Sequence, residues 1–147
     1  MITRDDLLQS GAVAIVRMPS QEAGQDVANR IVAAGLTTIE ITLTNPGALS
    51  IIENLAKRSG VLVGVGTVVD SKDVLRAKDA GATFIVSPNT DEDVIGETKR
   101  AGMISLPGVA TPSEVAAAKK YGADILKLFP ASTFGPGHLN CLLYTSP

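Results

Sequence analysis

The sequence predicts an α/β domain of alternating strands and helices, and three observations carry this prediction. First, a unit of roughly twenty residues recurs: a charged or alanine-rich segment ends at a glycine, and a short apolar run follows it, at Ala34, Ala80, Ala101 and Tyr121. Second, these runs are apolar on both faces, as in the strands of a buried parallel sheet. Third, a polar or conformationally special residue stands where each run ends. Strict alternation implies right-handed parallel crossovers.

The elements follow in order from these repeats. The apolar runs predict strands near residues 13–16, 38–43, 62–65, 84–87, 104–106 and 125–128. Helices are expected near residues 20–34, 46–57, 71–80, 91–101 and 112–121, each repeat helix ending before a glycine that can take the left-handed conformation. Three helix starts carry side chains that can cap free amides, namely Ser20, Asp70 and Thr111, and Pro112 fits a first helical position.

Two architectures fit this alternation: a doubly wound open sheet and a (β/α)₈ TIM barrel. A barrel draws its active site from the carboxyl ends of many strands, whereas an open sheet concentrates its site at one switch point. Every expected strand ends at a candidate residue, which favours the barrel, truncated here to about six βα units. These residues are Arg17, Glu40, Thr67, Pro88, Pro107 and Lys127.

Composition narrows the class of partner. A chain of 147 residues with 45% hydrophobic and 19% charged residues is expected to form one folded domain. The net charge is −2 and the basic residues are scattered, which disfavours a nucleic acid or an anionic membrane as partner. Neither a signal peptide nor an apolar run long enough to span a membrane is visible, so we expect a cytoplasmic protein with a small-molecule partner.

Lys127 is the sharpest chemical feature of the sequence. It lies inside the apolar strand Ile125-Leu126-Lys127-Leu128, and a buried lysine is rare unless it is paired or functional. Burial favours the neutral amine, which can attack a ketone to form a Schiff base. The alternative is a lysine whose head group reaches solvent at the strand end.

Glu40 interrupts a second apolar strand. Burial should raise the pKa of its carboxyl group, which suits a proton shuttle during carbinolamine formation and dehydration. The alternative, compatible with the first, is a structural ion pair with Arg17 on the neighbouring strand. Thr67 follows Gly64 and Gly66, whose backbone would let a ligand approach, and its hydroxyl could orient a carboxylate. A tight βα turn is the alternative for this segment.

The remaining candidates are two prolines and one histidine, and the inventory of metal-binding side chains argues against zinc and triad chemistry. Pro88 and Pro107 are expected to form walls of strand-end loops. The single histidine, His138, is expected on the surface of a Gly-Pro-Gly loop, and with only Cys141 beside it in the inventory the chain lacks a zinc cluster and a Ser-His-Asp triad. Metal-dependent enolate chemistry is therefore disfavoured, and no metal is expected.

Six ordered motifs, spread from about residue 5 to about residue 139, resemble one known family. They are Gly11 to Arg17, Ile39-Glu40-Ile41-Thr42-Leu43, Val63-Gly64-Val65-Gly66-Thr67, Val86-Ser87-Pro88-Asn89, Leu106-Pro107-Gly108 and Leu126-Lys127-Leu128-Phe129-Pro130. The set resembles the 2-keto-3-deoxy-6-phosphogluconate aldolases, a family that includes 4-hydroxy-2-oxoglutarate and 2-keto-3-deoxy-6-phosphogalactonate aldolases.

The resemblance implies a class I aldolase barrel, homotrimeric when full length, that needs no cofactor and cleaves a sugar acid phosphate to pyruvate and glyceraldehyde 3-phosphate. It implies that Lys127 forms the Schiff base and that Glu40 is the general acid/base. Arg17 and Thr67 would hold the carboxylate of the keto acid. Pro88 and Phe129 would line the pocket.

Two departures from the family pattern stand out. Thr44 stands where gluconate-type enzymes carry arginine, and the run Leu43-Thr44-Asn45-Pro46 is closer to galactonate-type enzymes. The family's phosphate loops follow the seventh and eighth strands, which this sequence does not reach. Residues 1–140 are thus expected to be an incomplete barrel. Residues 141–147 are expected to be a non-native tail, since one codon spelling of Cys141 to Ser146 matches a common sequencing adapter.

Two alternatives remain open at this point. Another phosphate-handling barrel, such as an isomerase or synthase of the tryptophan or thiamine pathways, shares the Ala-Gly-Ala repeat but does not need the strand around Lys127. An inactive fragment is the other alternative, because the phosphate loops are missing.

Overall fold

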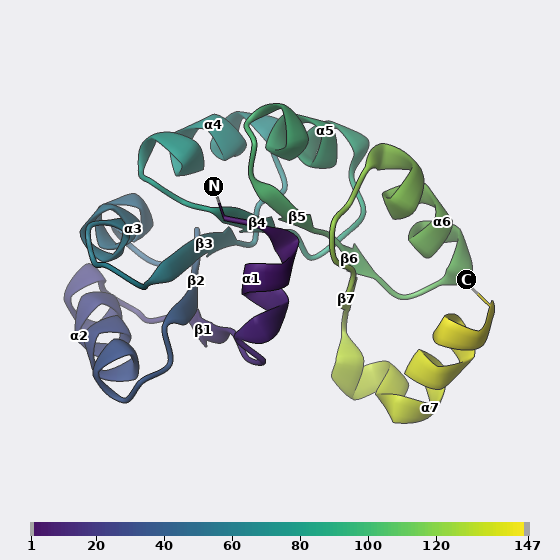
Figure 1. Cartoon of the computed structure of the whole chain (residues 1–147), viewed down its shortest axis with the longest axis horizontal. Coiled ribbons are helices and arrows are strands. Elements are labelled where there is room, and N and C mark those ends of the chain that lie inside the picture. Colours follow the sequence, from purple (N-terminus) through teal and green to yellow (C-terminus); the bar gives the residue numbers. More distant parts are fainter. Residues whose placement is uncertain (1, 146–147) are drawn as a thin grey trace.

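The computed structural model describes residues 2–145 and shows an arc of βα units, with strands on the inner side and helices outside (Figure 1). The strands are β1 (Ala14–Val16), β2 (Thr38–Thr42), β3 (Leu62–Gly66), β4 (Phe84–Val86), β5 (Ile104–Leu106), β6 (Gly108–Val109) and β7 (Lys127–Leu128). The helices are α1 (Arg4–Gln9), α2 (Gln21–Ala33), α3 (Ala48–Ala56), α4 (Ser71–Asp79), α5 (Glu92–Arg100), α6 (Pro112–Tyr121) and α7 (Ala131–Thr145).

The strands form two parallel ladders. β1 to β5 pair in sequence order, and β6 pairs with β7. All six predicted strands are present, but β6 was not predicted. Pro107 separates it from β5 because proline has no N–H to donate to the ladder. The predicted strand 125–128 shortens to two residues, although the amides of Asp124 and Ile125 still bond to the carbonyl of Ser105.

The three predicted helix caps are confirmed, whereas the helix expected from residue 46 begins at Ala48. Side chains of Ser20, Asp70 and Thr111 accept hydrogen bonds from backbone amides in the first turns of α2, α4 and α6. The glycine after α6, Gly122, has a φ of 93°, which an L side chain rarely adopts.

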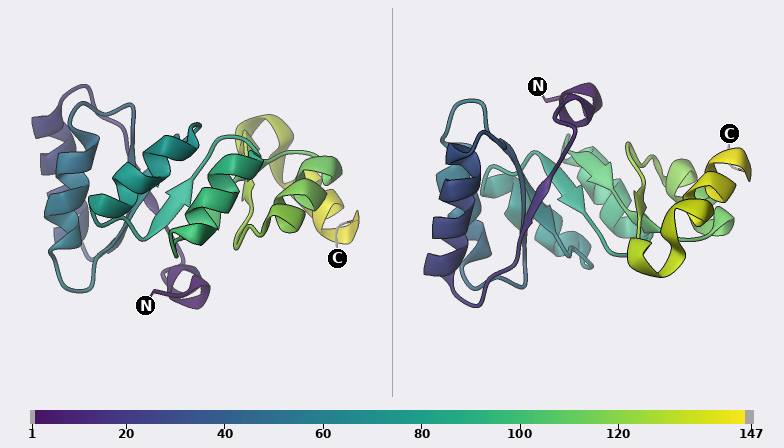
Figure 2. Two further views of the ribbon diagram at one scale, coloured as in Figure 1. Left: turned by 90° about the horizontal axis from the view of Figure 1, so that it is seen from above. Right: turned by 90° about the horizontal axis from the view of Figure 1, so that it is seen from below.

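Alternation along each strand separates two apolar layers. Ile39 and Ile41 of β2 face the outer helices and belong to the main core, whereas Glu40 faces the inside of the arc. On the inner side of the arc, Leu7 of α1 packs with Phe84, the first residue of β4, and with other inward residues near the amino-terminal end of the strands. Figure 2 shows α1 lying off this end of the sheet, so α1 does not cover the end with the carboxyl termini of the strands.

α7 differs from expectation. It bends at Gly135, and His138 lies in this helix rather than in a surface loop. The histidine is half-buried, because its Nε2 bonds the carbonyl oxygen of Ala110 and its ring stacks on Phe134. Residues 141–145 continue the helix and residues 146–147 lie outside the described part of the chain, so the expected boundary after residue 140 stays a prediction. Within residues 2–145, none of the helices combines the length and apolarity needed to cross a membrane.

Candidate active site

A pocket of about 510 Å³ opens at the carboxyl ends of the strands, and this volume suits a small ligand. Of the seven residues singled out from the sequence, the fold brings six together there, and only Pro107 is missing from the lining. The lining comprises Ile15, Arg17, Glu40, Thr67, Pro88, Lys127 and Phe129. Ile15 was not predicted; its signal in the sequence is its position two residues before Arg17, on the same face of β1.

Parallel pairing explains why residues so distant in sequence meet. Glu40 is in register with Ile15 on one side and Gly64 on the other, so β1, β2 and β3 present their ends at one level. Lys127 is in register with Gly108 across the β6–β7 ladder. The site therefore collects side chains from five strands or strand ends, as expected for a barrel and not for a single switch point.

Pro107 was expected to form a wall of a strand-end loop, but that wall is not part of the pocket. Pro107 is buried and does not line the pocket. Its carbonyl oxygen instead accepts a hydrogen bond of 3.0 Å from the amide of Lys127. Pro107 thus sets the position of the lysine backbone, because the carbonyl is the part of a proline that a sheet can still use.

Glu40 is almost fully buried, with 3% of its surface exposed. Burial raises the pKa of its carboxyl group, as predicted, and the positive charges of Lys127 and Arg17 act in the opposite direction. The ion pair with Arg17 considered from the sequence does not form within the described residues. Arg17 instead donates to the hydroxyl of Thr67 at 3.3 Å.

Lys127 is half-buried, which is less than the sequence predicted. The physical reason is that β7 pairs only with β6, so one side of the strand lacks a neighbour in the described chain. Its Nζ lies 4.9 Å from the centre of the Phe129 ring, a cation–π contact. The amine is thereby directed into the pocket while it remains accessible.

The glycines before Thr67 serve a different purpose from the one expected. A Cβ on Gly64 would overlap the Phe84 ring, and a Cβ on Gly66 would overlap the carboxylate of Glu40. They accommodate neighbouring side chains of the protein rather than a ligand. Thr67 itself has a φ of 62°, a strained conformation for a β-branched residue that is typical of functional sites.

The wall of the pocket at Pro88 is held in place by close backbone contact between the loop after β4 and strand β6. A Cβ on Gly108 would overlap the carbonyl of Pro88. Thr90 also donates to the carbonyl of Gly108 at 2.9 Å. The loop after β4 is therefore held against β6, and Pro88 is placed beside Lys127 in the lining.

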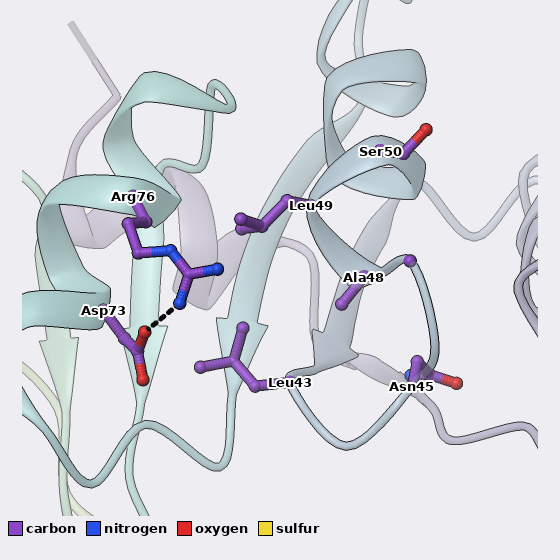
Figure 3. Close-up of a pocket in the computed structure, with 8 residues that line it drawn as sticks. Leu43, Asn45, Ala48, Leu49, Ser50, Asp73 and Arg76 are labelled. Carbon is purple, nitrogen blue, oxygen red and sulfur yellow. Dashed lines mark hydrogen bonds and ion pairs between the residues drawn. The ribbon is translucent and has the colours of Figure 1, made fainter.

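A second hollow, between α3 and α4, holds an ion pair of 2.7 Å between Asp73 and Arg76 (Figure 3). The charge of Arg76 is thus already matched, and the described residues that line this hollow include no nucleophilic amine or thiol. Among residues 2–145, no three His, Cys, Asp or Glu side chains gather as a metal site. The pocket at the strand ends is the candidate active site.

An arc of parallel βα units with an amine and a buried carboxylate at its strand ends defines a protein of the βα-barrel class with a lysine–glutamate site. Residues 4–142 match the sequence model described as "Aldolase: KDPG and KHG aldolase". The chain belongs to this family, whose initials denote the 2-keto-3-deoxy-6-phosphogluconate and 4-hydroxy-2-oxoglutarate substrates.

Individual relatives agree with this placement. A protein of Rhizobium meliloti named "Probable 2-dehydro-3-deoxy-6-phosphogalactonate aldolase" is 38% identical over 92% of this chain and 65% of its own length. The crystal structure of the 2-keto-3-deoxy-6-phosphogluconate aldolase of Zymomonas mobilis ZM4 superposes with a TM-score of 0.87 at 28% identity, over 99% of this chain and 72% of that one. The chain spans less than two thirds of the length of the Rhizobium relative.

A third relative bears on the chemistry. A structure of KDPG aldolase from Legionella pneumophila, 26% identical with a TM-score of 0.81, covers 88% of this chain and 64% of that one. It holds pyruvate captured at low pH as a covalent carbinolamine intermediate.

Proposed function

We propose that this chain forms a Schiff base with a 2-keto acid and supplies the pyruvate-handling half of a class I aldolase. One observation carries the proposal: Lys127 lines the strand-end pocket together with Glu40, a buried glutamate whose pKa is raised. A nucleophilic amine beside a carboxyl group that can hold and release a proton is what imine chemistry requires.

The steps assign a role to each group. The amine of Lys127, in its neutral form, attacks the carbonyl carbon at C2. The carbonyl oxygen gains a proton from Glu40, and the nitrogen returns one of its own protons to Glu40, which gives a neutral carbinolamine and a protonated Glu40. The hydroxyl then leaves as water, again with a proton from Glu40, and an iminium forms. In cleavage, Glu40 takes the proton of the C4 hydroxyl as the C3–C4 bond breaks, and the electrons move to the iminium to give an enamine.

Binding of the keto acid falls to the other residues. Arg17 offers a cation and Thr67 a hydroxyl, joined by their hydrogen bond, which suits a carboxylate. Pro88 and Phe129 exclude water from one side of the reacting carbon. The substrate we propose is a 2-keto-3-deoxy-6-phospho sugar acid of the galactonate type, since the loop carries Thr44 where gluconate-type enzymes carry arginine and the Rhizobium relative bears the galactonate name.

We also propose that the full-length parent is a cytoplasmic homotrimer. The family resemblance is the ground for this proposal. Light scattering coupled to size exclusion would measure the mass in solution, and a monomer or a dimer of the full-length parent would contradict the trimer.

Borohydride reduction tests the central proposal, because it converts an imine into a stable secondary amine. We expect pyruvate plus borohydride to add a pyruvate-derived mass to the peptide that contains Lys127. The adduct should disappear in Lys127→Ala and persist in Lys57→Ala, a matched control at an exposed lysine. Circular dichroism would establish that each sample is folded. A folded wild-type chain without adduct would rule out imine chemistry in this chain.

A further inference from the structure

We propose that Asn45 is a positioning residue for Arg17: its side-chain amide takes the place of a strand partner where the sheet has ended. This inference rests on the proposed function, in which Arg17 binds the carboxylate of the keto acid.

Arg17 needs such support because ordinary pairing stops just before it. The ladder between β1 and β2 ends at the pair Val16–Ile41, and β1 is the edge strand of the sheet. The side chain of Arg17 is exposed, and its guanidinium donates a long hydrogen bond of 3.3 Å to the hydroxyl of Thr67. The direction of the guanidinium therefore depends on how firmly the backbone at residue 17 is held.

Asn45 holds this backbone from both sides. Its Nδ2 donates to the carbonyl of Val16 at 2.7 Å, and its Oδ1 accepts from the amide of Met18 at 2.6 Å. In a parallel ladder, the residue opposite position 17 makes the same two bonds, one to the preceding carbonyl and one from the following amide. A carboxamide carries the donor and acceptor of a peptide unit, so it can substitute for that residue.

Asn45 is itself a fixed anchor. It is 3% exposed, and its Nδ2 also bonds the carbonyl and the hydroxyl of Thr42 at 3.1 Å each. Its own amide donates to the carbonyl of Thr42 at 2.9 Å, which closes the turn between β2 and α3. Figure 3 shows Asn45 at this turn, beside the hollow between α3 and α4. Since Asn45 does not line the active-site pocket, it acts on a ligand only through Arg17.

The test compares two ketones in Asn45→Ala: pyruvate, and methyl pyruvate, whose ester carries no charge. The pyruvate concentration that gives half-maximal borohydride trapping should rise about tenfold, from the loss of two hydrogen bonds, while the limiting trapping rate stays unchanged. The value for methyl pyruvate should hardly move. In an Arg17→Ala background, Asn45→Ala should have no further effect, because both changes remove the same interaction.

Thr98→Val is the matched control. Thr98 is fully buried and donates to the carbonyl of Val94 at 2.7 Å, so this variant also loses a buried hydrogen bond, but in α5. It should leave the dependence on pyruvate unchanged. If Asn45→Ala affects both ketones equally, or adds to Arg17→Ala, the positioning role is wrong and Asn45 only stabilises the fold.

A second readout is independent of imine chemistry. The NMR signal of the Arg17 Nε–Hε group should shift or broaden in Asn45→Ala and stay unchanged in Thr98→Val. If the folded wild-type chain forms no imine, the proposed function fails, and this signal alone decides the positioning role. An unchanged Arg17 signal in Asn45→Ala overturns it.

Discussion

The carboxylate of Glu40 occupies the space that a side chain at Gly66 would fill. A Cβ built on Gly66 would overlap Oε1 of Glu40 and crowd Cδ and Cγ. Gly66 has no positive φ, so the strand requires glycine here for space rather than for conformation. The contact fixes where the proposed acid/base group can lie, because Glu40 is enclosed by β3 on this side.

Gly66→Ala should therefore displace the Glu40 carboxylate. We expect imine formation with pyruvate to slow on the order of a hundredfold, since misplacing a general acid/base removes much of its contribution. Borohydride added at successive times after mixing with pyruvate, at several pH values, would measure this rate. Gly66→Ala with Glu40→Asp should recover part of it, because the shorter side chain relieves the overlap.

Gly64→Ala is the control for overpacking alone. Gly64 lies in the same strand as Gly66, but a Cβ at Gly64 would overlap the buried ring of Phe84 on β4 rather than the carboxylate of Glu40. Both variants should lose about 1–3 kcal/mol of stability. Only Gly66→Ala should change the pH profile of trapping; equal profiles would show that Gly66 does not position Glu40.

The raised pKa of Glu40 makes stability depend on pH in a defined direction. The folded chain binds this proton more tightly than the unfolded chain, whose glutamate has its ordinary value of 4.5. The favourable contribution is present below 4.5 and is lost as the pH rises through the higher folded-state pKa. Glu40→Gln does not titrate, so its stability relative to wild type should increase over this window. Urea unfolding on both sides of 4.5 measures the difference, and a constant difference contradicts the prediction.

Thr67 should show a trade-off between stability and binding. Its φ of 62° costs about 1–2 kcal/mol, and glycine relieves this strain while adding freedom to the unfolded chain. Thr67→Gly should thus raise the free energy of unfolding by about 0.5–1 kcal/mol. Pyruvate binding should weaken about threefold to tenfold, because the hydroxyl that bonds Arg17 is lost.

Thr67→Ala separates these two effects. It removes the hydroxyl but keeps the strained backbone, so binding should weaken as in Thr67→Gly without the gain in stability. Thermal melts and trapping titrations on both variants make the comparison. Normal pyruvate binding in either variant would exclude Thr67 from the carboxylate site.

The end of α7 offers a prediction about packing. Leu142 is 6% exposed and packs with Ile95, Val109 and Val115, whereas the adjacent Leu143 is 66% exposed. Leu142→Ala should destabilise the chain by about 2–3 kcal/mol, since it removes a buried leucine. Leu143→Ala should change stability by less than about 0.5 kcal/mol. Equal effects in chemical denaturation would show that this helix does not pack as described.

Much of the fold was predictable because local rules agreed with one another. The glycines after the helices, the caps at Ser20, Asp70 and Thr111, and the apolar runs all mark boundaries that neighbouring residues suffice to define. β6 escaped prediction because a two-residue strand has no period to detect. His138 was misplaced because its glycine and proline neighbours indicate a loop, whereas contacts with Ala110 and Phe134 hold it in a helix.

For the candidate site, too, some features could be predicted from the sequence and others depend on the tertiary structure. The sequence by itself determined that Lys127 and Glu40 lie in apolar strands and that Arg17, Thr67, Pro88 and Phe129 follow strand ends, because strand periodicity is local. Only the tertiary structure decided that these six line one pocket, that Pro107 supports a backbone amide instead, and that Gly64 and Gly66 make room for Phe84 and Glu40. The physical reason is that contacts between strands depend on register, and register is settled by packing across the whole sheet.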